Sequence, residues 1–314
     1  MNILYVDPAV NTATSAKYRY YDGVYNELVK KHNVCLLNVA FDDLEKAVKY
    51  TNFKPDILIF GIGFFGKTRF FGKIKNLNIP TACFLFKPQN DLEHKLNFCK
   101  INDIDLIYTP IPTYQKYQEI TNVKTILFPF GFDPHFFKPR DIEKEYDFGF
   151  SGALHNSSLY PKDSFQVQNL RPKIGQVLKN STDLNVFWNS SDDASKAFID
   201  SYEEYAMTVN KSKMWLATLA AFGDVTPRYY EVLGSGTVLF CQEIPKTYKY
   251  LLKNGVNCVE FKNDLSDFKD TILYYKDNPD RLNQISKNAV DFFHNNWTWK
   301  HRADSLIEEI RKVS

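Results

Sequence analysis

The chain has 314 residues, 44% of them hydrophobic, which is enough for two globular domains of about 150 residues each. Its 39 basic and 37 acidic residues leave a net charge of +2, which argues against a nucleic-acid groove and a polybasic membrane anchor. The five cysteines include no C-x-x-C pair, which is typical of reduced core thiols. The start, MNILYVDP, lacks a basic leader, and the longest apolar run, residues 57–65, is too short to span a membrane. We therefore expect a cytoplasmic protein without a transmembrane segment.

The first half of the chain alternates short apolar runs with amphipathic stretches. The runs are rich in Val, Ile, Leu and Phe on consecutive positions, which predicts parallel strands covered on both faces. They occupy residues 3–7, 34–39, 56–62, 81–86, 105–109 and 124–130. After the first run, a stripe at helical spacing predicts a helix, formed by Tyr18, Tyr21, Tyr25, Leu28 and Val29. This alternation indicates βαβ units and a doubly wound sheet.

A segment with two prolines and a glycine, residues 130–140 (FGFDPHFFKPR), interrupts this pattern. A charged run follows it, as is typical of a linker between domains. We predict an N-terminal domain over residues 1–135, a C-terminal domain over 136–296 and a final helical segment over 297–314.

The second half repeats the scheme of the first. Strands are expected at residues 147–151, 184–188, 213–218, 237–242 and 257–261. Helices are expected at residues 168–179, 227–233, 265–275 and 280–294, and the last stretch, 297–313, is one amphipathic helix.

Three segments, in order along the chain, carry a family resemblance. Residues 127–139 (LFPFGFDPHFFKP) contain P-x-G-x-D-x-x-x-F-x-P, residues 147–152 read DFGFSG, and residues 226–237 read TPRYYEVLGSGT, with NKSK at 210–213 upstream. Together they resemble an interdomain hinge, a glycine turn and a donor-binding signature of the group 1 glycosyltransferases, in particular the spore-maturation-type subset. The resemblance implies the GT-B architecture: two Rossmann-like doubly wound domains facing across a cleft, with a C-terminal helix that crosses back to the N-terminal domain.

The resemblance also implies an activity. A glycosyltransferase, hexosyl or pentosyl, would move a sugar from a UDP- or GDP-sugar to a hydroxyl of a glycan, a lipid-linked molecule or a small molecule. We expect no D-x-D metal site and no metal requirement, so that cations of the protein meet the charge on the leaving group. Many group 1 enzymes carry a further glutamate at the position of Gly223, so whether the reaction retains or inverts stays open. Two alternatives also stay open: a nucleotide-sugar isomerase or epimerase, and a catalytically silent sugar-nucleotide-binding protein.

The donor site is expected around the start of the helix at 227–233. Pro227 suits a first helical turn, Thr226 can cap it, and the free N–H groups of that turn attract a diphosphate. Arg228 offers donors to the charge that grows on a departing diphosphate, and the resemblance implies that Glu231 accepts hydrogen bonds from ribose hydroxyls. An ordinary capped helix with a surface ion pair is the alternative. The other predicted donor residues are Gly152, Asn156, Asn210, Lys213, Gly236 and Thr237.

The acceptor is expected at the N-terminal half. Asp7, Gly61 and Gly63 follow predicted strands, at the ends where open α/β sheets bind ligands. Asp91 follows the fourth strand and is a candidate general base if the reaction inverts. Its alternative role is that of an N-cap for a helix at residues 92–100.

Overall fold

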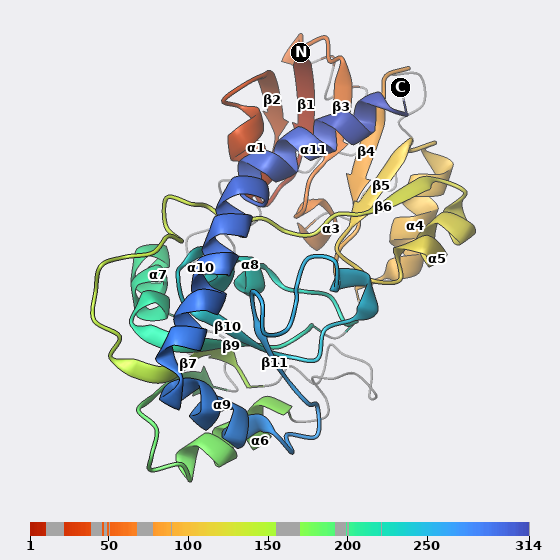
Figure 1. Ribbon diagram of the computed structural model, residues 1–314. Helices are drawn as coiled ribbons and strands as arrows, with labels where there is room; N and C mark the ends of the chain where they lie inside the picture. Colours follow the sequence, from red (N-terminus) through yellow and green to blue (C-terminus); the bar gives the residue numbers. More distant parts are fainter. Residues whose placement is uncertain are drawn as a thin grey trace. The chain divides into compact units, whose positions relative to one another are not determined.

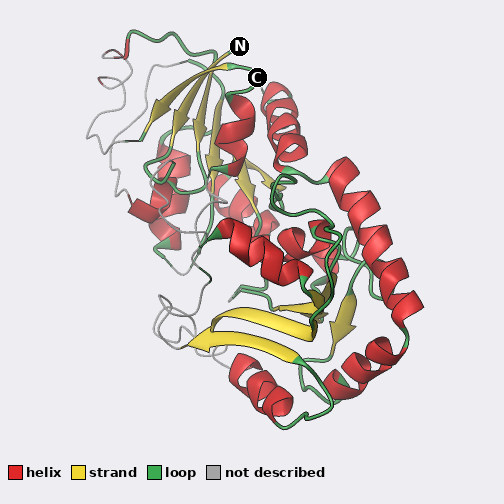
Figure 2. Cartoon of the chain, turned by 90° about the vertical axis from the view of Figure 1, so that its left-hand side faces the viewer, coloured by secondary structure: helices red, strands yellow, loops and turns green. Residues whose placement is uncertain are grey.

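The computed structural model describes residues 1–10, 22–38, 46, 49, 51–67, 78–88, 90–154, 170–191, 199, 201–220 and 222–313. The chain divides into two compact units. The first comprises Met1–Thr14, Tyr18–Pro129 and Trp299–Ser314, and the second comprises Ser15–Lys17 and Phe130–Thr298. Each contains a parallel sheet with helices packed against it (Figures 1 and 2).

Six parallel strands form the sheet of the first unit, in the order β2-β1-β3-β4-β5-β6. They are β1 (Asn2–Val6), β2 (Asn33–Leu37), β3 (Ile57–Phe60), β4 (Thr81–Phe84), β5 (Leu106–Thr109) and β6 (Lys124–Leu127). Every residue of β3, β4 and β5 is buried, as their unbroken apolar runs require. Because β1 lies between β2 and β3, the chain reverses its direction of winding beside β1, and the carboxyl ends of β1 and β3 form a switch point.

The described residues of the first unit form the helices α1 (Gly23–Leu28), α3 (Phe64–Lys67), α4 (Leu92–Ile101), α5 (Tyr114–Thr121) and α11 (Trp299–Arg311). The last of these returns to the first unit after the chain has completed the second (Figure 1). Gly23 of α1 lies directly against the indole of Trp299, where a Cβ would collide. The predicted C-terminal helix that packs on the N-terminal unit is therefore confirmed.

The second unit contains five parallel strands in the order β11-β10-β9-β7-β8. They are β7 (Tyr146–Ala153), β8 (Val186–Ser191), β9 (Ser212–Ala217), β10 (Val238–Gln242) and β11 (Val259–Phe261). The accompanying helices are α6 (Leu170–Lys179), α7 (Tyr202–Asn210), α8 (Pro227–Gly234), the 3-10 helix η3 (Lys246–Tyr248), α9 (Phe268–Asp277) and α10 (Pro279–Asn296). Since β7 pairs with both β8 and β9, the winding reverses between β7 and β9. A ligand site of this unit is expected at the carboxyl ends of these two strands.

Each of the eleven predicted strands is present, with ends that differ by at most three residues from the predicted ones. Among the described helices, the short α3 and η3 and the longer α5 and α7 were not predicted. Ser201 caps α7, because its hydroxyl accepts a hydrogen bond from the Glu204 amide at 3.2 Å. The signal for α7 was the capping sequence Ser-Tyr-Glu-Glu at 201–204.

Arg302 attaches α11 to the end of β6. Its Nε donates to the Pro129 carbonyl at 3.1 Å, and its guanidinium lies 4.3 Å from the centre of the Phe128 ring. The side chain is buried, so removing it leaves both a cavity and an unpaired carbonyl. We predict that Arg302→Ala lowers the free energy of unfolding of the first unit by about 2–4 kcal/mol. Urea denaturation measures the change, and faster hydrogen exchange in α11 and α1 would localise it.

The control is Asp304→Asn, on the same helix. It breaks the ion pair of Asp304 with Lys31, whose side chains are 42% and 40% exposed. Such a pair contributes less than about 1 kcal/mol. If the two variants lose equal stability, the Arg302 contacts do not attach α11.

Candidate functional site

The site of the second unit forms around Phe150, on β7 near the switch point. Arg228 comes from the first turn of α8, and its guanidinium carbon lies 5.4 Å from the centre of the Phe150 ring. Gly152, two residues further along β7, has a φ of +155°, and a Cβ there would lie 3.0 Å from both terminal nitrogens of Arg228. The glycine therefore leaves room for the guanidinium. The Nε of Arg228 is buried without a hydrogen-bond partner among the described residues, so this cation keeps an unused donor.

A second cation, Arg171 of α6, approaches the same ring. Its guanidinium carbon lies 5.5 Å from the Phe150 centre. Its Nε donates to the Thr218 hydroxyl at 2.9 Å, and its Nη1 donates to the Ala153 carbonyl at 2.6 Å. Arg171 thereby joins the carboxyl ends of β7 and β9. The sequence analysis did not identify Arg171. A usable signal was its position in the first turn of the helix that follows the first strand of a Rossmann unit.

Glu231 is the buried carboxylate of the site, one helical turn beyond Arg228. It is 7% exposed, and its Oε1 accepts a hydrogen bond from the Tyr202 hydroxyl at 2.9 Å. Desolvation raises the pKa of Glu231 from 4.5 to about 7, although Tyr202, Arg228 and Tyr205 act in the opposite direction. Burial likewise raises the pKa of both tyrosines. Glu231 therefore titrates near neutral pH.

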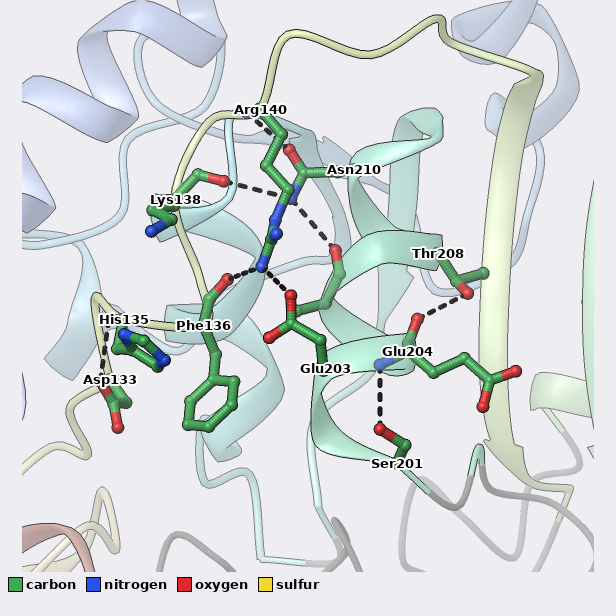
Figure 3. Close-up of polar contacts among 11 residues, drawn as sticks. Asp133, His135, Phe136, Lys138, Arg140, Ser201, Glu203, Glu204, Thr208 and Asn210 are labelled. Carbon is green, nitrogen blue, oxygen red and sulfur yellow. Dashed lines mark hydrogen bonds and ion pairs between the residues drawn. The ribbon is translucent and has the colours of Figure 1, made fainter.

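The linker lies along α7, the helix that carries Tyr202 (Figure 3). Arg140 pairs with Glu203 at 2.6 Å, and its Nη2 donates to the Phe136 carbonyl at 3.2 Å. At the other end of α7, Asn210 donates to the Lys138 carbonyl at 3.2 Å and accepts from the Arg140 amide at 3.1 Å. Both ends of α7 thus hold residues 136–140 in place.

Four predicted donor residues lie at the amino edge of the sheet, opposite the carboxyl edge where a ligand is expected. In a parallel sheet each helix returns the chain to the amino edge, so residues that follow a helix lie opposite the ligand edge. Asn210 and Lys213 stand where α7 leads into β9, and Gly236 and Thr237 stand where α8 leads into β10. Their assignment to the donor stays a prediction, which their position at the amino edge does not favour.

The contacts of these four residues explain their presence instead. The ammonium of Lys213 pairs with Asp147 at 2.8 Å, at the start of β7. The Thr237 hydroxyl donates to the Val209 carbonyl at 2.7 Å. Gly236 has a φ of +74°, and a Cβ at this position would lie 3.1 Å from Pro139. With Asn210, which holds the linker, they stabilise the unit.

Of the other predicted donor residues, Thr226 occupies the N-cap position of α8, but its side chain makes no capping hydrogen bond. Pro227 opens the helix as predicted. Asn156 lies outside the described residues.

The first unit brings Asp7, Gly61 and Gly63 together at its switch point. The Asp7 carboxylate accepts hydrogen bonds from the amides of Ala9 and Gly63, both at 2.8 Å. A Cβ at Gly61 would collide with the same carboxylate and one at Gly63 would lie 2.6 Å from it, so both turns need glycine. Asp7 is fully buried, which does not favour a direct contact with an acceptor, so its acceptor role stays a prediction. It connects the turns after β1 and β3.

Asp91 has a different environment. It is exposed, and its backbone is left-handed, with φ +59°. It occupies the N-cap position of α4, as the alternative interpretation predicted, but its side chain makes no capping hydrogen bond. It lines a groove of about 740 Å³ whose other walls come from α4 and the end of α5.

Lys95, in the first turn of α4, is a buried cation that the sequence analysis did not single out. It donates to the carbonyls of Phe86 and Lys87, both at 2.8 Å, and so fixes the segment after β4. Desolvation lowers its pKa to about 8.

Among the described residues, no three His, Cys, Asp or Glu side chains cluster in a way that could hold a metal ion. A D-x-D triplet does occur in the N-terminal half, at Asp103-Ile104-Asp105. Asp105 accepts hydrogen bonds from the Thr81 amide and hydroxyl at 2.7 and 2.9 Å, at the amino end of β4. The triplet is therefore structural. Within the described parts of the chain, no helix has the length and apolarity needed to cross a membrane.

Comparisons with known proteins agree with this arrangement. Residues 174–308 match a protein family described as glycosyl transferase-like. No curated protein sequence matches the chain. Sucrose-phosphate synthase from Thermosynechococcus elongatus superposes with a TM-score of 0.62 at 10% identity, over 100% of this chain and 99% of that one. HepE from Anabaena, solved with UDP and glucose, has a TM-score of 0.62 at 12% identity, over 99% and 100% of the two chains. An alpha-glucosyltransferase solved with UDP and a 13-mer DNA has a TM-score of 0.56 at 9% identity, over 99% of both chains.

At these identities the solved structures establish the fold. The chain has the GT-B fold, with two Rossmann-like units, and its residues 174–308 carry the sequence pattern of the glycosyl transferase-like family. The predicted fold of two Rossmann-like units is confirmed, and the match over residues 174–308 agrees with the group 1-like resemblance.

The raised pKa of Glu231 makes stability depend on pH. The folded pKa of about 7 lies above the ordinary 4.5, so the folded state holds the proton more tightly than the unfolded chain does. The contribution of Glu231 is then largest below pH 4.5 and is lost as pH rises through 7. We predict that Glu231→Gln, which cannot ionise, gains about 2–3 kcal/mol over wild type between pH 5 and pH 8. Urea unfolding across that range measures the difference.

Glu309 of α11 serves as the control, because Lys312 and Lys124 lower its pKa. Its contribution is present above the ordinary pKa of 4.5 and is lost as pH falls below it. Glu309→Gln should therefore show no pH trend relative to wild type between pH 5 and pH 8, and a trend of opposite sign below pH 4.5. Parallel pH profiles for wild type and Glu231→Gln would mean that Glu231 is not desolvated.

Proposed function

We propose that the protein is a glycosyltransferase that moves a sugar from a nucleotide-diphosphate donor to an acceptor hydroxyl. The observation that carries the proposal is the pair of guanidinium groups, Arg228 and Arg171, on one aromatic ring at the switch point of the second unit. A diphosphate bears negative charge that planar, multiply donating cations recognise well. The glycosyl transferase-like match over residues 174–308 supports the same chemistry.

The donor would bind by three kinds of contact. Arg228 and the positive end of the α8 dipole meet the diphosphate, and Gly152 lets the backbone of β7 come close to it. Thr226 stands at the same helix start with a hydroxyl that makes no capping bond. Glu231, once ionised, accepts hydrogen bonds from the ribose hydroxyls. UDP is the nucleotide we favour, because several of the structural neighbours were solved with it.

The chemistry needs a group that stabilises the leaving diphosphate, and we assign this role to Arg228. Its buried Nε is available for an oxygen that becomes more negative as the glycosidic bond breaks. We propose that no metal ion is required and that the enzyme acts in the cytoplasm. On the acceptor side we retain Asp91 as the candidate base, since it is exposed at the groove beside α4.

A silent sugar-nucleotide-binding protein would share the donor contacts and differ only in turnover. An isomerase or epimerase would instead convert the donor without releasing nucleotide. Incubating the protein with UDP-glucose separates the three when both UDP release and the identity of the remaining UDP-sugar are measured. Only the transferase releases UDP, at least slowly to water as acceptor; only the isomerase or epimerase changes the sugar of the remaining donor; and the silent protein does neither.

Nucleotide binding without metal is the first test. We predict that titration calorimetry detects UDP binding and that adding a chelator changes the affinity by less than about tenfold, or about 1.4 kcal/mol. A parallel thermal-shift screen with UDP, GDP, CMP and dTDP identifies the base, since a bound nucleotide stabilises the native state. A larger loss on chelation would reveal a metal site.

Arg228 and Glu231 should affect different kinetic constants of UDP release. We predict that Arg228→Ala lowers kcat about 10²-fold or more, because it removes a contact that strengthens in the transition state. Glu231→Gln should mainly raise the donor KM, by about 1–3 kcal/mol of binding free energy, because ribose is held equally in the ground and transition states. Unfolding midpoints must first show that both variants are folded. If only these midpoints change, the two residues stabilise α8 and do not serve the reaction.

A further inference from the structure

Tyr202 occupies the position between the linker and the buried carboxylate. Its ring packs edge-on against Phe136 at 5.0 Å and against Phe137 at 4.9 Å between ring centres. Its hydroxyl donates to Glu231, and the tyrosine itself is buried. One side chain therefore contacts the linker with its ring and α8 with its hydroxyl.

The ring is held firmly from the linker side. Phe137 is fully buried and also packs against Tyr205, at 5.8 Å between ring centres. The ion pair of Arg140 with Glu203 fixes the linker beside the first turn of α7 (Figure 3). Because the aromatic contacts leave the Tyr202 ring little freedom, the direction of its hydroxyl is set before any ligand arrives.

We propose that Tyr202 is a positioning residue of the donor site, which holds the Glu231 carboxylate in one orientation and transmits the placement of linker residues 136–137 to it. The proposal rests on the proposed donor role of Glu231. It makes the linker a supporting part of the donor site, in addition to its role as the connection between the units.

The hydrogen bond from Tyr202 also favours the ionised carboxylate. Three groups that ionise or carry charge face Glu231, namely Tyr202 and Tyr205 from α7 and Arg228 from its own helix, and all three lower its pKa against the effect of burial. Tyr202 is the largest of these influences. Without its hydroxyl the pKa of Glu231 should rise, so at neutral pH more of the protein would carry a protonated Glu231, which is a poorer acceptor for ribose.

The test uses Tyr202→Phe, which removes the hydroxyl and keeps the ring. At pH 7 we expect UDP to bind about tenfold more weakly than to wild type, and at pH 9 the difference should shrink to about twofold as Glu231 ionises. Titration calorimetry at both pH values measures this. The matched control is Tyr229→Phe, which removes a buried hydroxyl that has no hydrogen-bond partner among the described residues, on the same helix as Glu231. It should bind UDP as wild type does.

A second readout does not need any ligand. Carbon-13 NMR of labelled glutamate carboxyls, with the Glu231 signal identified by its loss in Glu231→Gln, gives the pKa directly. We expect a midpoint about one pH unit higher in Tyr202→Phe than in wild type, and an unchanged midpoint in Tyr229→Phe. An unchanged midpoint in Tyr202→Phe, or a loss of UDP affinity equal at pH 7 and pH 9, would overturn the proposal. If wild type binds no UDP, the proposed function fails for that nucleotide, and the NMR midpoint still decides the role of Tyr202.

The contribution of the linker is tested by Phe136→Leu, which keeps an apolar side chain but removes the aromatic contact with Tyr202. We expect the Glu231 midpoint to shift in the same direction as in Tyr202→Phe. A midpoint equal to that of wild type would show that the linker does not position Tyr202.

Discussion

Every neighbouring pair of strands in both units runs parallel, and this one constraint determines which residues can meet a ligand. Each helix carries the chain back across the sheet, so residues before a helix gather at the carboxyl edge and residues after it gather at the amino edge. In the second unit the carboxyl edge holds Gly152, Thr218 and the start of α8. The amino edge holds the Lys213–Asp147 pair and the buried Thr237 hydroxyl, which stabilise the sheet. The signature sequence, residues 226–237, is thus divided between the two edges. Its first residues lie at the carboxyl edge, where a ligand is expected, and its last residues lie at the amino edge, where they stabilise the sheet.

At the carboxyl edge of the second unit, aromatic packing places two positive charges around one ring. Guanidinium groups are weakly hydrated and stack on ring faces, so Phe150 offers both Arg171 and Arg228 a favourable surface. Arg171 also donates to a hydroxyl and to a carbonyl. Two cations at one sheet edge raise the local affinity for anions. This argues for an anionic ligand independently of any family resemblance.

The strands could be predicted from sequence because apolar runs on consecutive positions leave few alternatives to a buried parallel strand, as β3 and β10 illustrate. The start of α8 was predictable for a similarly local reason, since Thr226 and Pro227 are residues that open helices. The partners of a side chain depend on residues distant in sequence, and these were missed. Arg171 reaches Thr218 across 47 positions, and Tyr202 reaches Glu231 across 29. Such contacts cannot be predicted from the periodicity of the sequence. A sequence motif predicts a contact only when both residues belong to the motif.

The raised pKa of Glu231 indicates why this residue is present at all. A glutamate buried in α8 among phenolic groups is less stable in its charged form than in water, and a leucine of similar size would fill the space without that penalty. Arg228, one turn away, has a buried Nε that finds no acceptor among the described residues, which is unfavourable for the same reason. The needs of the two groups are complementary, because the Glu231 carboxylate needs further hydrogen-bond donors and the Arg228 Nε needs an acceptor. A ligand with hydroxyls and a phosphate oxygen would satisfy both, so the stability that the free protein forgoes would return as binding free energy.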